Sequence, residues 1–186
     1  MAAWQRAGRQ AEERSAYVEA VAHLNTGLQL LATLSDTPER ARHELALQMT
    51  RGSVLTDLEG PASLAVEQAY ARAQELCQQI GETPQLTPVL LGLAIFYNNV
   101  RGQLPTAYRL AQQALELAQR GHDPVVLARA HAILGTSLFL RGEPVAARTH
   151  LEQSQALYAP QQHRFDVFRG PVFCLVRLAQ VLWYLG

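Results

Sequence analysis

The residues that could support catalysis or metal binding are scattered along this chain, and none stand at a productive spacing. Glu12 and Glu13 are adjacent, and adjacent residues of a helix point about 100° apart, so they cannot act as a pair of catalytic carboxylates. No Ser-His-Asp or Cys-His set can be inferred. We therefore expect no catalytic residue, no metal and no cofactor, and we interpret His131 as a partly buried structural residue. The histidines lack the spacing of metal ligands; they are His23, His43, His122, His131, His150 and His163.

Cysteine and lysine usage also argues against an enzyme. Cys77 and Cys174 fall in different predicted helices with no second cysteine or histidine at metal spacing, so we expect two buried free thiols. All sixteen basic residues are arginines, which leaves no lysine for a Schiff base, a phosphate-binding loop or a nucleophilic amine. We expect the chain to have no enzymatic activity.

The composition is that of a soluble, helix-rich protein. Hydrophobic residues make up 48% of the 186 positions and aromatic residues 7%, and the hydrophobic residues are mostly leucine and alanine, which favour helices. β-branched residues never alternate with polar ones over the length of a strand. No apolar run is long enough to cross a membrane, and no charged and then apolar leader opens the sequence. We expect an all-α cytoplasmic protein.

The charge is zero overall but unequal along the chain. Residues 1–93 carry seven arginines and eleven acidic residues, whereas residues 94–186 carry nine arginines and five acidic residues. Binding to a phosphate backbone needs clustered cations, and RNA binding by helical repeats needs stacking aromatics or base-reading side chains in each repeat. The sequence offers neither, so we expect a protein or peptide partner and no nucleic acid.

The segment 128–157 holds one complete structural unit, in which two helices are joined by a tight turn. Leu134 and Leu138 recur at helical spacing in the first helix. Pro144 opens the second helix, where its missing N–H costs nothing. Gly135 and Ala147 are small, which we interpret as the point where the two helices cross. This layout is typical of a tetratricopeptide repeat.

The same layout recurs in the first half of the chain. Gly8 and Ala20 stand twelve residues apart, as the small residues of segment 128–157 do. Gly52 and Val66 stand fourteen apart, which we interpret as two extra residues in the turn, a tolerable surface insertion. Two further repeats are therefore expected here.

The third repeat is the least regular. Its second helix carries Ala107, and the residue twelve positions earlier, where a small one is expected, is Ile95. Gly92 and Ala94 stand nearby, so the register of this repeat stays open. The repeats are expected at about 1–34, 38–80, 84–120 and 124–158, with half a repeat at 171–186 after an irregular stretch at 158–170.

Three helices are expected to begin at a Thr-Pro or Asp-Pro pair. The first residues of these pairs are Thr37, Thr83 and Asp123. Their side chains can cap the first turn, and the proline that follows can occupy the first helical position.

Four stretches resemble the long-period tetratricopeptide arrays of bacterial multidomain signalling proteins, in which they follow an AAA or STAND type ATPase and often a class III adenylate or guanylate cyclase. The resemblance spans nearly the whole chain and implies one tetratricopeptide-like domain over 1–186, an all-α right-handed superhelix of about nine antiparallel helices. It also implies a fragment of a longer multidomain protein. The stretches are VEQAYARAQELCQQIGETPQL (66–86), LAIFYNNVRGQL (93–104), LYAPQQHR (157–164) and LVRLAQVLWYLG (175–186).

For function, the resemblance implies a non-enzymatic protein–protein interaction scaffold or regulatory segment of such a signalling protein. The alternative is a domain that senses an effector or peptide for a fused ATPase, cyclase or transcription regulator, since regulators of the maltose-activator type carry similar arrays. Any ATPase or nucleotide cyclase domain is expected to lie outside this chain.

In arrays of this type the first helices of the repeats line a concave groove, where we expect the partner to bind. A second interpretation places Phe96 and Phe139 in the core between repeats, because the helix register decides which way each points. The lysine, asparagine and arginine clamp that some such grooves use for a carboxylate-ended peptide is absent, since the corresponding positions hold Gln5, Arg9 and Thr50. The candidate groove residues are Arg9, Glu12, Met49, Ser53, Thr56, Phe96, Asn99, Arg129, Thr136, Phe139 and Gln180.

The helix expected at 171–185 is apolar nearly all round. One face should pack on the fourth repeat, and we expect truncation to leave the opposite face uncovered. Because one patch can serve both chains of a two-fold pair, the sequence favours a homodimer through this helix. We interpret such a dimer as a product of the truncation. The candidate residues for self-association are Leu175, Leu178, Leu182 and Trp183.

Overall fold

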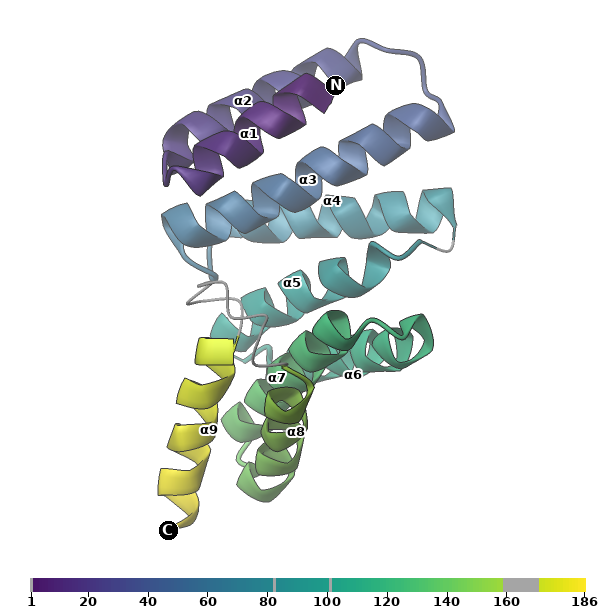
Figure 1. Ribbon diagram of the computed structural model, residues 1–186. Coiled ribbons are helices and arrows are strands. Elements are labelled where there is room, and N and C mark those ends of the chain that lie inside the picture. Colours follow the sequence, from purple (N-terminus) through teal and green to yellow (C-terminus); the bar gives the residue numbers. More distant parts are fainter. Residues whose placement is uncertain (1, 82, 101, 159–170) are drawn as a thin grey trace.

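The computed structural model describes residues 2–81, 83–100, 102–158 and 171–186, and every regular element in these ranges is a helix (Figure 1). The all-α fold is thus confirmed for the described residues. The irregular stretch expected at 158–170 lies outside them, apart from Tyr158. The helices are α1 (Ala2–Glu13), α2 (Tyr17–Ala32), α3 (Pro38–Glu59), α4 (Leu64–Ile80), α5 (Leu86–Asn99), α6 (Leu104–Gly121), α7 (Pro124–Leu140), α8 (Pro144–Leu157) and α9 (Pro171–Leu185).

Two helix starts follow from a side-chain cap and a proline, as predicted. The Thr37 hydroxyl accepts a hydrogen bond from the backbone N–H of Arg40 at 3.1 Å, and Pro38 is the first residue of α3. Asp123 caps α7 in the same way and accepts from two backbone N–H groups of the first turn, at 2.9 and 3.2 Å. Such caps satisfy N–H groups that have no partner within the helix.

The start of α5 differs from the prediction. Thr83 and Pro84 predict a helix start, yet α5 begins at Leu86. The backbone N–H of Leu86 donates to the Thr83 carbonyl at 3.1 Å, so residues 83–86 form a turn ahead of the helix. Pro88 then falls in the first turn of α5, where a missing N–H costs no bond within the helix. A second proline therefore allows a later start.

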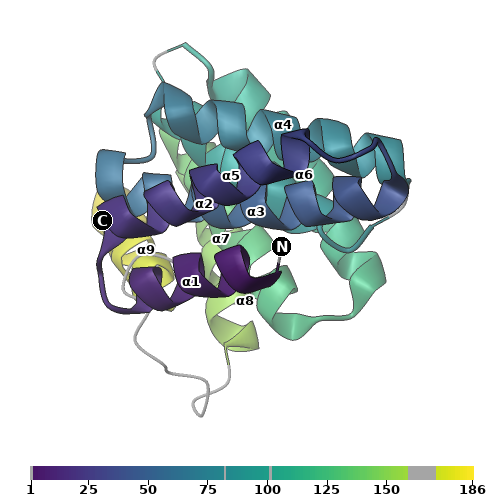
Figure 2. The ribbon, with the colours of Figure 1, turned by 90° about the horizontal axis from the view of Figure 1, so that it is seen from above.

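The helices form antiparallel pairs that stack one after another (Figures 1 and 2). The most extensive contacts lie within the pairs α1–α2, α3–α4, α5–α6 and α7–α8, and each second helix also packs on the first helix of the next pair. α9 packs on α8, in the place of the first helix of a fifth pair. This successive packing makes a superhelical array with α1 and α9 at its two ends (Figure 1).

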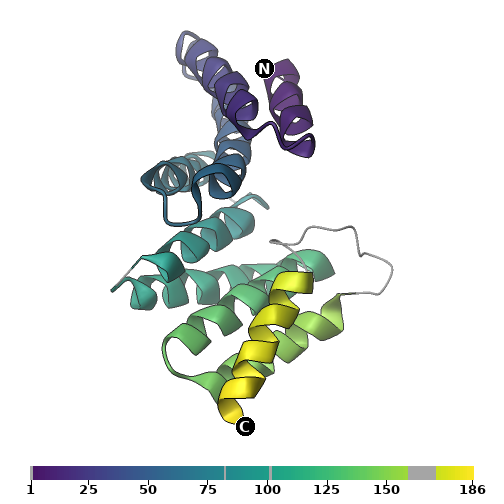
Figure 3. The ribbon, with the colours of Figure 1, turned by 90° about the vertical axis from the view of Figure 1, so that its left-hand side faces the viewer.

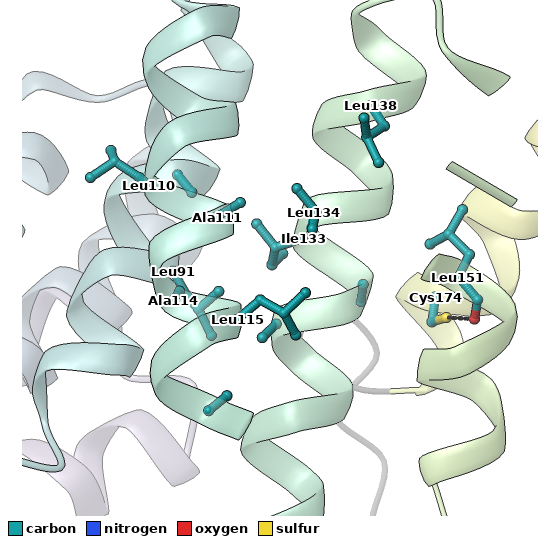
Figure 4. Close-up of a cluster of buried hydrophobic side chains, with 14 of the residues drawn as sticks. Leu91, Leu110, Ala111, Ala114, Leu115, Ile133, Leu134, Leu138, Leu151 and Cys174 are labelled. Atoms are coloured by element: carbon teal, nitrogen blue, oxygen red, sulfur yellow. Dashed lines mark hydrogen bonds between the residues drawn. The ribbon is translucent and has the colours of Figure 1, made fainter. Parts of the chain in front are cut away.

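A hydrophobic core runs through the C-terminal half of the array. Leucine and alanine side chains from α5, α6, α7 and α8 fill it (Figure 4). Cys174 of α9 also belongs to this core, and its thiol donates a hydrogen bond to the Leu151 carbonyl at 3.3 Å. This core continues from α5 to α9, whereas the helices before it bury two smaller clusters, one among α1, α2 and α3 and one among α3, α4 and α5.

Small residues mark the points where paired helices cross. A Cβ at Gly135 would lie 2.8 Å from Leu151 Cγ and 3.1 Å from the Ala147 carbonyl oxygen, which confirms the predicted crossing of α7 and α8. A Cβ at Gly8 would lie 2.9 Å from Leu24. A larger residue at either glycine would have to push the helices apart.

Tyr70 of α4 lies against two glycines from two different first helices. A Cβ at Gly52 of α3 would lie 2.8 Å from its ring, and a Cβ at Gly92 of α5 would lie 2.5 Å from it. The ring therefore fills the space that both glycines leave, and α3, α4 and α5 meet around it. Of the candidates in the third repeat, Gly92 faces the preceding pair, Ala94 is fully buried in the core, and Ile95 is half-buried beside it.

Gly92→Ala should lower the free energy of unfolding by about 1–3 kcal/mol, the usual cost of overpacking a tight core. The Tyr70 ring cannot move aside freely, because Gly52 confines it from α3. Gly121→Ala is the matched control: Gly121 ends α6 and has open space around its Cβ position, so this change should stay within about 0.5 kcal/mol of wild type. Urea denaturation followed by circular dichroism measures both. A Gly92→Ala variant as stable as the control would contradict this packing.

Candidate functional site

The candidate groove residues differ in how far the structure exposes them. The side chain of Arg9 lies outside the described residues. The other candidates fall into three classes: Glu12, Met49, Ser53, Thr56, Arg129 and Phe139 are half-buried, Phe96 and Thr136 are buried, and Asn99 and Gln180 are exposed. The row of first helices is therefore not one uniform groove.

Four half-buried candidates gather at the N-terminal end of the row. The Ser53 hydroxyl of α3 donates to the Glu12 carboxylate of α1 at 3.0 Å, which joins the first two pairs. Met49 and Thr56 lie one turn before and after Ser53 on α3, and the Thr56 hydroxyl donates to the Gly52 carbonyl at 2.7 Å. We call Glu12, Met49, Ser53 and Thr56 the α1–α3 patch. It combines a carboxylate, two hydroxyls and a thioether, and the half-buried Met49 also packs against the core cluster of α3, α4 and α5.

The middle of the row is closed, which corrects the exposure expected for two candidates. α5 packs directly on α7, and Phe96 and Thr136 are only 5% and 4% exposed. The Thr136 hydroxyl donates to the Ala132 carbonyl of its own helix at 2.9 Å. Of the two interpretations of Phe96, the structure supports the core position. A partner would have to separate helices to reach these side chains.

Three further candidates, on α5, α7 and α9, make separate contacts. Asn99 donates to a carbonyl of its own helix at 2.7 Å, and Gln180 accepts a hydrogen bond from Arg177 at 2.9 Å. The ring of Phe139 on α7 meets that of Tyr184 on α9 edge to face, with centroids 6.1 Å apart. Tyr184 was not a candidate, although its position one turn after Gln180 on the same helix is the signal that would have identified it.

The four candidates for self-association on α9 do not share one face. Leu178 is buried in the core shared with α8, so it is not available to a second chain, which corrects the prediction for this residue. Leu175, Leu182 and Trp183 are exposed. These three side chains remain candidates for contact with a partner.

Charged groups tie α4 to the helices on either side. Arg72 donates to the Glu44 carboxylate of α3 through Nε at 2.7 Å and Nη2 at 3.2 Å, and to Glu75 through Nη1 at 2.9 Å. The hydrogen bonds to Glu44 are the main cause that raises the pKa of Arg72. The Tyr97 hydroxyl of α5 donates to Glu67 at 2.6 Å, which raises the pKa of Tyr97. These groups hold the array together and are already engaged.

The two cysteines are buried and free, as predicted. Burial raises the pKa of the Cys77 thiol to about 11 and also raises that of Cys174. Because the thiolate is the reactive form, neither side chain offers a nucleophile at neutral pH.

His131 and His150 form a contact that sequence reasoning missed. Their Nδ1 atoms lie 3.0 Å apart between α7 and α8, and their rings are stacked with centroids at 5.2 Å. One Nδ1–H must donate to the other Nδ1, so at least one ring is neutral. Burial, and then the neighbouring His150, lowers the pKa of His131 to about 4. Within the described residues no group of three histidine, cysteine or acidic side chains could hold a metal ion, so we interpret this pair as structural.

The stability of the fold should fall as the pH drops from about 6.5 to about 4. His131 has a pKa near 6.5 in an unfolded chain and about 4 in the fold, so folding favours the neutral ring and protonation favours unfolding. Below both pKa values the full loss is reached, and the free energy of unfolding is then lower by about 3 kcal/mol.

His131→Leu should remove this part of the acid sensitivity. His122→Asn, at an exposed position with a left-handed backbone, should retain it. Denaturant titrations of the three proteins at about pH 7.5 and pH 4.5, which lie on either side of the unfolded value, measure the difference. An equal loss of stability in His131→Leu and wild type would show that His131 is not its source.

No helix in the described part of the chain is both long and apolar enough to span a bilayer.

Comparison with known proteins adds no relative to this picture. No protein-family model matches the sequence, and no curated protein matches it either. What the chain does must therefore be inferred from the described residues.

Proposed function

We propose that this chain is a non-enzymatic scaffold that binds a protein or peptide through the first helices of its pairs. The observation that carries the proposal is the α1–α3 patch, in which helices from two successive pairs place Glu12 and Ser53 within 3.0 Å of each other. Stacked pairs make a surface wider than one helix, and the core behind it keeps that surface fixed. A patch shared by two pairs can contact a segment of several residues.

We also propose that the pairs are tetratricopeptide repeats. Gly8, Gly52 and Gly135 each face a large side chain of the following helix, sixteen to eighteen residues further along the chain. The expected spacing of the repeats exceeds the usual period of about 34 residues, and long helices such as the 22-residue α3 account for this. The resemblance of stretches 66–86 and 93–104 supports a regulatory segment of a bacterial cytoplasmic signalling protein.

The charge of this region favours a basic partner. Residues 1–93 carry four more acidic residues than arginines, and the α1–α3 patch contributes the carboxylate of Glu12. A segment with an arginine or lysine next to an apolar residue fits a patch that contains Glu12 and Met49. Attraction between exposed charges is screened by salt, so binding at this surface should weaken as the ionic strength rises.

A photo-crosslinking amino acid at position 56 should capture the partner. Thr56 is half-buried at the edge of the α1–α3 patch, whereas Gln113 is exposed on α6, a second helix. Each variant is irradiated in an extract of the source organism, and the captured proteins are identified by mass spectrometry. We expect proteins captured at position 56 that are absent at position 113 and that disappear at high salt. Identical sets at both positions would refute the proposed surface.

The isolated chain should bind no nucleotide. It contains no lysine for a phosphate-binding loop, and the proposed scaffold has no catalytic role. Isothermal titration calorimetry with ATP and Mg²⁺ is expected to give no heat of binding at concentrations up to about 1 mM, a typical upper value for enzyme substrates. Stoichiometric binding of ATP would overturn the non-enzymatic assignment.

A further inference from the structure

α9 carries a stripe in which a small residue lies between two leucines. The stripe consists of Leu175, Ala179 and Leu182, and we call it the crossing stripe. It repeats the pattern of α7, where a glycine lies at the same spacing between two larger residues. The corresponding residues of α7 are His131, Gly135 and Leu138.

In α7 this pattern is covered by the helix that follows. His131 reaches His150 of α8 through the contact at 3.0 Å, and a Cβ at Gly135 would lie 2.8 Å from Leu151 of α8. His131 and Leu138 are therefore only 8% and 4% exposed. A stripe of this form is thus a surface on which another helix lies with its backbone close.

In α9 the stripe is uncovered. Leu175 and Leu182 are 46% and 42% exposed, and the neighbouring Trp183 is 86% exposed. Figure 3 shows α9 on the outer side of the array, with none of the described helices in front of it. The side of α9 that packs on α8 is a different one, and it carries Cys174 and Leu178.

The exposed side of α9 is apolar and carries no charge. Val172 and Val176 flank the crossing stripe and are also exposed. Arg177 is the only ionisable basic or acidic residue of α9. Its guanidinium lies 5.6 Å from the centre of the Phe173 ring and donates to Gln180 at 2.9 Å. The charge of Arg177 is thus engaged with Phe173 and Gln180, and no charged side chain belongs to the crossing stripe or to the valines that flank it.

We infer that a second copy of this chain covers the crossing stripe. α9 of one copy packs on α9 of the other about a two-fold axis, with Ala179 at the point where the helices cross. This inference is independent of the proposed function, because it uses neither the α1–α3 patch nor its partner.

Two properties of the face favour a second copy over an unlike partner, and a third allows a close crossing. A two-fold axis lets the same patch serve both chains. The absence of charge means that no like-charge repulsion opposes two identical faces. The small side chain of Ala179 allows the backbones to approach, as Gly135 does in α7. One helix face per chain is smaller than the roughly 800 Å² per partner of a standard interface, so we expect a dissociation constant on the order of 10 μM.

Sedimentation equilibrium of the full chain between about 1 and 300 μM, a range centred on the expected constant, should show a monomer–dimer equilibrium. Leu182→Glu places a charge in the paired face and should raise the dissociation constant at least about 30-fold. Val145→Glu is the matched control, because Val145 is 69% exposed on α8 and lies outside the stripe, and it should leave the constant unchanged. A chain that stays monomeric overturns the inference and points to an unlike partner. A dimer that Leu182→Glu leaves intact also overturns it.

Ala179→Leu tests the crossing point itself. This change adds apolar surface, so a non-specific association would become tighter. A close crossing at Ala179 would instead be forced apart, and the dissociation constant should rise about tenfold or more. Both α9 variants alter exposed residues, and circular dichroism checks that they fold. Tighter association of Ala179→Leu would exclude a crossing at this residue.

Discussion

The ring of Tyr70, held between Gly52 and Gly92, sets the distance between the second and third helix pairs. The same helix, α4, binds α5 through Glu67 and α3 through Arg72. One packing contact and two charge-assisted contacts thus fix three successive helices. The charge-assisted contacts matter because hydrogen bonds to charged groups are stronger and more directional than neutral ones. Because each pair contacts only its neighbours, an error at this junction would change the course of every pair beyond it.

Signals that act over a few residues predicted most of the helices. The caps at Thr37 and Asp123 depend only on the first turn that follows them. The predicted start of α5 at Thr83 and Pro84 was wrong, because Pro88 is also compatible with a first turn and residues 83–86 form a turn ahead of the helix. The partner of Gly92 was beyond such signals. Tyr70 belongs to the preceding pair, whereas the repeat pattern places the partner of a crossing residue in the helix that follows it.

The candidate site was predicted less well, because exposure depends on the distance between helices of different pairs. Helical periodicity groups Phe96 and Thr136 with Ser53 on the same side of the first helices. α5 and α7 lie in contact, however, so that side is buried there. Periodicity gives the direction of a side chain, and it does not give the depth at which that side chain lies. The contact between His131 and His150 was missed for the same reason, since it depends on how α7 crosses α8.

The buried middle of the row leaves the two ends of the array as the surfaces on which our two proposals rest. A ligand that followed the whole row of first helices would meet Phe96 and Thr136 in the middle of it, and both side chains are buried. The α1–α3 patch lies at one end and α9 at the other (Figure 1). In a dimer formed through α9, the two α1–α3 patches would therefore lie at opposite outer ends. Such a dimer would bind a partner with two suitable segments far more tightly than a monomer would, provided that the linker between the segments spans both patches. Pairing through α9 would then control the apparent affinity of a surface that it does not touch.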